Sequence, residues 1–105
     1  MAYALVQEFP VQPGDRSTAN YDAIHKAIMT KVAGPTGLII HTAGFTGDTF
    51  RIFEVWESRE QCDAFMREVV MPTVMEVTDG NPGNAPATTT YELHNVLLPQ
   101  RALTG

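Results

Sequence analysis

The residues in this sequence whose types and spacing best fit a chemical role are a histidine and a carboxylate, His41 and Glu54. The stretch over residues 37–57, GLIIHTAGFTGDTFRIFEVWE, predicts two strands joined by a tight turn, because strand-forming residues flank the dipeptide Gly47-Asp48. Counting outward from that turn places His41 opposite Glu54 on the neighbouring strand. A carboxylate beside an imidazole fixes its tautomer and stabilises the imidazolium. The pair could then act as a general base toward a phenol or an activated C–H bond.

The same count divides the hairpin into two faces. One face carries the histidine and the carboxylate together with Phe45, Phe50, Ala43, Ile52, Ile39 and Trp56. The other face carries Leu38, Ile40, Thr42, Phe53 and Val55. Both faces are largely apolar, whereas a hairpin buried on one side only would show a polar face. We therefore expect both faces to be covered.

Each candidate residue also has a purely structural interpretation. The His41–Glu54 pair could be a structural ion pair or a solvated strand histidine. Trp56 and Phe50, with Ile52 beside them, could form an aromatic wall for a planar ligand or could pack in a subunit interface. Gln7 could orient a ligand carbonyl or bond to a neighbour within the sheet. The sequence leaves these alternatives open.

The elements around the hairpin predict the fold. A strand over residues 2–9 precedes a helix whose apolar side chains recur at helical spacing: Tyr21, Ile24, Ile28 and Val32. After the hairpin, Ser58 and Gln61 form a capping box, which opens a helix with Cys62 in its buried stripe. Pro72 is expected to end or kink this helix. Residues 79–90 form a loop, and residues 89–98 form the last strand.

The order strand, helix, strand, strand, helix, strand predicts a single ferredoxin-like α+β domain over residues 1–105. With right-handed crossovers it gives a four-stranded antiparallel sheet with both helices on one face. We expect a second copy of the chain to cover the other hairpin face, with Trp56 and Phe50, so that the protein forms a homodimer. In the last strand, Tyr91, Leu93 and Leu97 are expected to face the helices, which would direct His94 toward the dimer interior, where it could contact a ligand or have a structural role.

Composition excludes several functional classes. The 105 residues carry a formal net charge of −5 and no basic run, which argues against nucleic acid or an anionic membrane surface as a partner. The single cysteine cannot form an internal disulfide, and the N-terminal residues do not resemble a signal peptide, so we expect a cytoplasmic protein. The three histidines show no zinc-site spacing, and we find no phosphate-binding loop or hydrolase nucleophile motif, so no metal site is expected.

Three features together resemble the dimeric α/β-barrel superfamily, and within it the antibiotic-biosynthesis-monooxygenase type. They are the element order, the Pro13-Gly14 turn after the first strand, and the segment EVWES at residues 54–58 before a capped helix. The resemblance implies that two sheets pack face to face and that each subunit holds a ligand cavity. It also implies a cofactor-independent monooxygenase, or a related isomerase or cyclase, that acts on a small aromatic or polyketide-like molecule. A non-catalytic dimeric ligand-binding or stress-related protein is the alternative.

The local match is closest to the small heme-degrading monooxygenases. Their functional residues are an Asn on the first strand, a Trp in a W-E-S segment and a heme-binding His on the following helix. Trp56 matches the Trp, whereas Gln7 stands in place of the Asn and Met66 in place of the His. Because imidazole is the usual iron ligand for this chemistry, we expect no tight heme binding and no cofactor.

Overall fold

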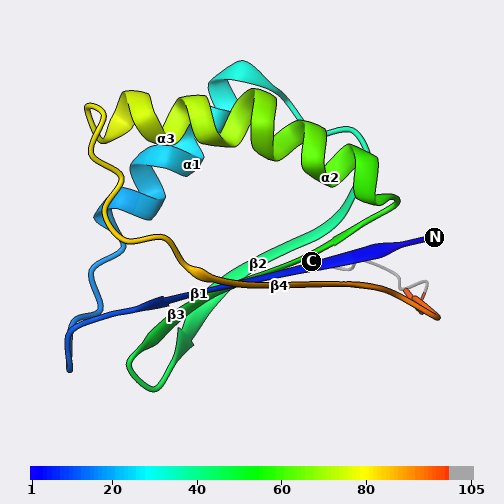
Figure 1. Cartoon of the computed structure of the whole chain (residues 1–105), viewed down its shortest axis with the longest axis horizontal. Helices are drawn as coiled ribbons and strands as arrows, with labels where there is room; N and C mark the ends of the chain where they lie inside the picture. The colour runs from blue at the N-terminus through cyan, green and yellow to red at the C-terminus, as the bar shows by residue number, and fades with distance from the viewer. Residues whose placement is uncertain (100–105) are drawn as a thin grey trace.

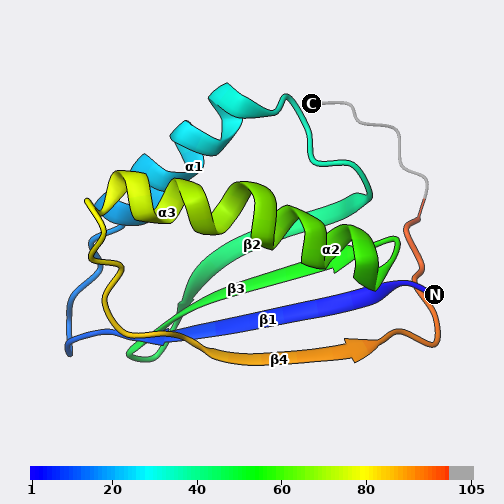
Figure 2. The same cartoon turned by 45° about the horizontal axis from the view of Figure 1, so that its top comes forward.

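The computed structural model describes residues 1–99 of the chain. Its elements, in chain order, are β1 (Tyr3–Pro10), α1 (Ala19–Lys31), β2 (Leu38–Thr46), β3 (Thr49–Trp56), α2 (Arg59–Phe65), the π-helical segment η1 (Met66–Val70), α3 (Met71–Val77) and β4 (Ala87–Glu92). The strands form one sheet in the order β2-β3-β1-β4, with antiparallel pairing throughout. All the helices lie on one face of the sheet (Figures 1 and 2). The predicted ferredoxin-like α+β fold is confirmed.

The register counted from the hairpin turn is confirmed over most of its length. Phe45 lies opposite Phe50, and His41 lies opposite Glu54. At the base of the hairpin the count is wrong, because a β-bulge between Leu38 and Ile40 adds one residue to β2. Leu38 rather than Ile39 therefore pairs with Trp56, and Leu38 packs against the core on that side.

The helices cover the hairpin face that the sequence analysis had assigned to a second subunit. Trp56 is fully buried in a cluster with Tyr3, Leu5 and Cys62, and Phe65 of α2 packs on it. The prediction that this face needs an intersubunit contact is therefore wrong. The apolar face without helices is the opposite one, and its large exposed side chains include Ile40 and Tyr91.

The second helical region runs further than the sequence predicted. Pro72 does not end it, because α2, η1 and α3 follow one another without a break from Arg59 to Val77 (Figure 2). The N–H of Met71 bonds to the carbonyl of Met66, which is the wider π-helical spacing. Pro72 follows directly and lacks an N–H to donate to the preceding turn. The start of this region is as predicted, since Ser58 Oγ accepts the N–H of Gln61 at 3.2 Å.

The last strand is shorter and starts earlier than predicted. It spans Ala87–Glu92, so the preceding loop ends near Pro86 and His94 lies beyond the strand. Tyr91 pairs with Ala4, whose neighbours Tyr3 and Leu5 belong to the core under the helices, so Tyr91 projects from the opposite face. The prediction that Tyr91 faces the helices is therefore wrong. Among the helices within residues 1–99, none is long and apolar enough to cross a membrane.

The buried thiol of Cys62 should make stability fall at alkaline pH. Burial raises the pKa of Cys62 from 9.0 to about 11, and the negative charges of Glu54 and Asp63 add to the effect. Because the folded state disfavours the thiolate, this stability is present below pH 9 and is lost as the pH rises toward 11. Urea unfolding should show wild type losing about 2 kcal/mol more than Cys62→Ala between pH 8.5 and 11. Parallel pH profiles for the two proteins would contradict this assignment.

Candidate active site

A cavity of about 770 Å³ lies between the sheet and the helices. Its wall is mainly apolar and comes from α1, β3 and the second helical region, with Ile24, Ile28, Phe50, Ile52, Met66 and Val70 among the lining residues. Its volume lies in the range of cavities that hold small organic ligands. The π-helical segment contributes the last two of these side chains to the cavity.

His41 and Glu54 lie together in the wall of this cavity. His41 Nδ1 is 2.5 Å from Glu54 Oε2, and the Trp56 indole N–H donates to Glu54 Oε1 at 3.0 Å. Glu54 is only 7% exposed. Both carboxylate oxygens therefore have a hydrogen-bond partner inside the protein, which is what a buried acidic group requires.

A tyrosine extends this hydrogen-bonded chain from the opposite side of the cavity. The hydroxyl of Tyr21, on α1, is 2.5 Å from His41 Nε2. Its position in the sequence identifies Tyr21 only as a member of the apolar helix stripe. Its hydroxyl was the one available signal, since Ile24, Ile28 and Val32 in that stripe carry no polar group. Which strand residue the hydroxyl meets depends on how α1 packs on the sheet.

When the His41 ring is neutral, the hydrogen bonds in this chain have one consistent direction. A carboxylate only accepts, so Glu54 accepts the N–H of Trp56 on one oxygen and the Nδ1–H of His41 on the other. With its proton on Nδ1, a neutral His41 has a lone pair at Nε2. Tyr21 then donates its O–H to that lone pair. The arrangement favours the His41 tautomer that carries its proton on Nδ1. The basic nitrogen is then Nε2, which faces Tyr21.

Aromatic rings surround the hydroxyl end of the chain. The ring of Tyr21 stacks on that of His25, with centroids 5.8 Å apart, and meets Phe50 edge-on at 5.2 Å. The rings of His25 and His41 lie 6.0 Å apart. Burial raises the pKa of Tyr21 above its usual value of 10.0, and the charges of Glu54 and Asp22 raise it further. Tyr21 is therefore a neutral phenol at physiological pH and can donate to His41.

The other predicted ligand-contacting residues divide into two groups. Gln7, Phe50 and Ile52 line the cavity. Trp56 does not, because it is fully buried behind the wall with its ring 5.4 Å from that of Phe65. It contacts Glu54 instead of forming an aromatic wall. His94 is exposed after the end of β4 and is not among the residues that line the cavity.

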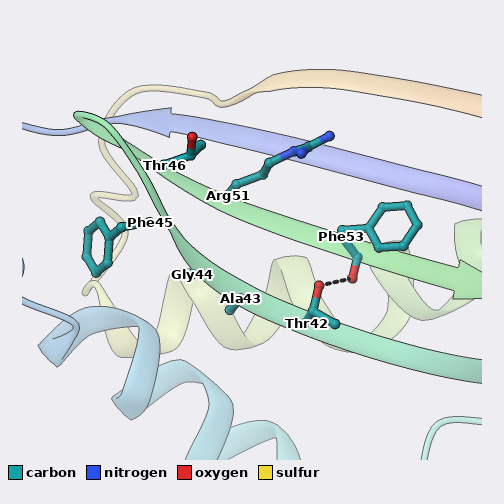
Figure 3. A pocket seen from close by; sticks show the side chains of 7 residues that line it. All are labelled: Thr42, Ala43, Gly44, Phe45, Thr46, Arg51 and Phe53. Carbon is teal, nitrogen blue, oxygen red and sulfur yellow. Dashed lines mark hydrogen bonds between the residues drawn. The ribbon is translucent and has the colours of Figure 1, made fainter.

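A second depression, of about 500 Å³, lies on the outer side of the hairpin near its turn (Figure 3). Arg51 and Phe53 project from the same side of β3, and the Thr42 hydroxyl donates to the Phe53 carbonyl at 2.9 Å. Arg51 is the one ionisable residue among those lining it, so this depression has no acid–base pair. Within residues 1–99, no group of three or more His, Cys, Asp or Glu residues is placed to hold a metal ion.

Comparison of the whole fold with solved structures finds strong similarity at low sequence identity. A Nitrosomonas europaea protein of unknown function, NE2512, matches with TM-score 0.67 and 20% identity over 95% of this chain and 96% of its own. The Streptomyces coelicolor monooxygenase from the gene ActVA-Orf6, solved with the ligand nanaomycin D, matches with TM-score 0.64 and 17% identity over 94% and 93%. SnoaB of Streptomyces nogalater, a cofactor-independent oxygenase solved as a mutant, matches with TM-score 0.60 and 12% identity over 91% and 96%.

These similarities show that the chain has the fold of the antibiotic-biosynthesis-monooxygenase-like proteins, as the sequence resemblance implied. Proteins with this fold include cofactor-independent oxygenases as well as proteins of unknown function. No protein-family model matches the sequence, and no curated protein matches it either. The fold is therefore established, whereas the activity has to be argued from the cavity.

Removing the charge of Glu54 should destabilise the protein. Both carboxylate oxygens accept N–H groups, and an amide has only one oxygen, so Glu54→Gln directs an NH₂ group at Trp56 or His41. We expect Glu54→Gln to lower the free energy of unfolding by about 1–3 kcal/mol in urea titrations. Glu57→Gln, an identical change at an exposed position, should lie within about 0.5 kcal/mol of wild type. Equal values for the two variants would contradict the bonding described for Glu54.

Proposed function

We propose that this protein is a cofactor-independent monooxygenase that acts on a small, neutral, aromatic or polyketide-like molecule. The observation that carries the proposal is the hydrogen-bonded chain from Trp56 through Glu54 and His41 to Tyr21, in the wall of an apolar cavity. In this role His41 is the general base, and Glu54 orients it and stabilises the imidazolium. Gln7, Phe50 and Ile52 contact the ligand.

The proposed reaction begins with loss of a proton from the bound molecule. The resulting electron-rich anion can pass an electron to O₂, so the substrate itself supplies the reducing equivalents. An anthrone shows how the reaction balances. Its CH₂ group gives up four electrons to O₂, one oxygen atom becomes a new carbonyl, and the other leaves as water. What this requires from the protein is a base, an apolar site and space for a planar ligand. A related isomerase or cyclase would need the same first step.

The composition of the cavity wall disfavours an anionic ligand. Its acidic side chains are Asp15 and Glu54, and none of the described residues that line it is Lys or Arg. A phosphate or carboxylate buried there would lack a cationic partner, which is costly in an apolar site. Heme carries two carboxylates, so this wall also argues against heme degradation. The helix position where those enzymes have their iron-binding histidine is occupied by Met66, which lines the cavity.

The alternative is a dimeric protein that binds the same kind of molecule without converting it. Tight packing around His41 would have favoured that alternative, whereas a cavity beside a polarised histidine favours catalysis. The distinguishing result is turnover. If aromatic ligands bind in the cavity and none is converted, the binding protein is the better account.

We also propose that the chain forms a homodimer through the outer face of its sheet. This face carries Phe53 and the exposed side chains of Ile40 (41% exposed) and Tyr91 (46% exposed), and no helix within the described residues 1–99 covers it (Figure 1). Burying it against a second copy would remove this apolar surface from water. Phe50 and Ile52, for which the sequence leaves a subunit interface open, line the cavity instead.

Loss of His41 should remove most of the activity. Oxygen uptake with anthrones and naphthohydroquinones identifies a substrate first, and His41→Ala should then lower turnover by roughly 10²- to 10⁴-fold. The matched control is His25→Ala, because His25 stacks beside the chain without hydrogen-bonding to it. Turnover by His25→Ala should fall by less than about tenfold, since ring stacking contributes less to the rate than general-base catalysis does. Full turnover by a folded His41→Ala protein would exclude His41 as the base.

A charge on the outer face should dissociate the dimer. Phe53→Asp would bury an unpaired carboxylate in the proposed interface, which costs several kcal/mol. Light scattering at micromolar concentration should therefore give a dimer for wild type and a monomer for Phe53→Asp. Met75→Asp, the same kind of change at an exposed position on α3, should remain dimeric. A monomeric wild-type protein would rule out the proposed dimer.

A further inference from the structure

We propose that Tyr21 meets the hydroxyl group of the substrate and passes its proton to His41, so that the substrate reacts as a phenol or enol and not as a carbon acid. This inference rests on the function proposed above and narrows its substrate class. It starts from the position of the Tyr21 hydroxyl, which is hydrogen-bonded to the basic nitrogen of His41.

A neutral imidazole has one lone pair with which to take a proton. In His41 that lone pair is at Nε2, because Nδ1 carries the proton that bonds to Glu54. The Tyr21 hydroxyl, 2.5 Å away, already uses it. A bound molecule therefore cannot contact the basic nitrogen unless Tyr21 moves away or takes part in the transfer.

The packing around Tyr21 favours participation over movement. Its ring contacts His25 and Phe50, with centroids 5.8 Å and 5.2 Å apart, in addition to the hydrogen bond to His41. The first turn of α1 is held by a hydrogen bond of 2.8 Å from the Thr18 hydroxyl to Asp22. Moving the Tyr21 ring out of the way would give up all its contacts at once. Tyr21 and His41 both line the cavity, so we place the substrate hydroxyl against the Tyr21 hydroxyl.

The relay balances without any further reactant. Tyr21 donates its own proton to His41 and still has lone pairs on Oη with which to accept a hydrogen bond. When the substrate O–H bond breaks, its proton moves to Oη as the Tyr21 proton moves to Nε2. The products are a substrate oxyanion, an unchanged neutral Tyr21 and an imidazolium that faces the Glu54 carboxylate. No electron is transferred in this step.

This geometry selects a hydroxyl over a C–H bond. An O–H group forms a short, directional hydrogen bond to a phenol oxygen, which aligns it for transfer, whereas a C–H group does so only weakly. Burial and the charges of Glu54 and Asp22 raise the pKa of Tyr21 above its usual value, which disfavours a free tyrosinate. The two protons are therefore expected to move together.

The first test measures binding and does not depend on turnover. Fluorescence titration compares 2-naphthol with naphthalene, which differ only in the hydroxyl group. Wild type should bind 2-naphthol roughly five- to tenfold more tightly, as expected for one hydrogen bond. Tyr21→Phe keeps the ring and its packing, so it should bind naphthalene as wild type does and lose the preference for 2-naphthol. A preference that survives in Tyr21→Phe would overturn the inference.

The second test measures the relay with dithranol, an anthrone that forms an enol. Tyr21→Phe should lower kcat by roughly 10²-fold with little change in KM, because the proton path is interrupted while the binding surface remains. The double variant Tyr21→Phe/His41→Ala should be no slower than His41→Ala alone, because both residues serve one transfer. Effects that multiply would show that Tyr21 acts separately and would overturn the relay. Thermal unfolding of each variant confirms that it is folded.

The two proposals fail in different ways. Wild type that binds neither naphthalene compound and consumes no O₂ with any anthrone or quinol would overturn the proposed function. Wild type that turns over dithranol, loses that activity in His41→Ala and keeps it in Tyr21→Phe would overturn only the inference about Tyr21. If Tyr21→Phe unfolds, replacement of Tyr21 by 3-fluorotyrosine keeps the ring and hydroxyl and should change kcat. An unchanged kcat would again overturn the relay.

Discussion

The candidate site depends on the bonding of one buried carboxylate. Glu54 is 7% exposed, and the N–H groups of Trp56 and His41 satisfy its two oxygens. Because a carboxylate cannot donate, these two bonds determine where the proton of His41 lies and leave its other nitrogen basic. Trp56 is therefore important as a fixed donor behind the cavity, although its ring does not reach the cavity. Tyr21 completes the chain from the opposite layer of the fold.

The rest of the fold holds these groups in place. Antiparallel pairing of β2 and β3 places His41 beside Glu54, and the bulge near the start of β2 brings Leu38 onto the same face to pack with Trp56. The helices then cover this face without filling it, so an apolar cavity remains beside the basic nitrogen. The outer face of the sheet exposes Ile40 and Tyr91, and no helix within residues 1–99 lies over it (Figures 1 and 2). One side of the sheet thus holds the cavity that we propose for catalysis, and the other is the face that we propose for the dimer contact.

Local patterns predicted the element order and the His41–Glu54 pair, because strand alternation and a turn dipeptide act over a few residues. They could not show which hairpin face the helices cover, since both faces are apolar and the choice depends on how the layers pack. The bulge at the base of β2 could not be predicted either, because the extra residue is Ile39 and not a glycine or proline. The role of Tyr21 was missed for a related reason, because a tyrosine in a helix stripe looks like any core residue until α1 is packed on the sheet.

The central claim is that Glu54 and Tyr21 hold neutral His41 with its proton on Nδ1 and with its Nε2 lone pair accepting the Tyr21 hydroxyl. Nitrogen-15 NMR of the histidine rings, with His41 assigned from the His41→Ala spectrum, reports this tautomer directly at a pH where the ring is neutral. We predict a protonated Nδ1 and an unprotonated Nε2 that accepts a hydrogen bond, with the Nε2 signal shifting in Tyr21→Phe. A proton on Nε2, or an Nε2 signal that does not respond to Tyr21→Phe, would contradict the account.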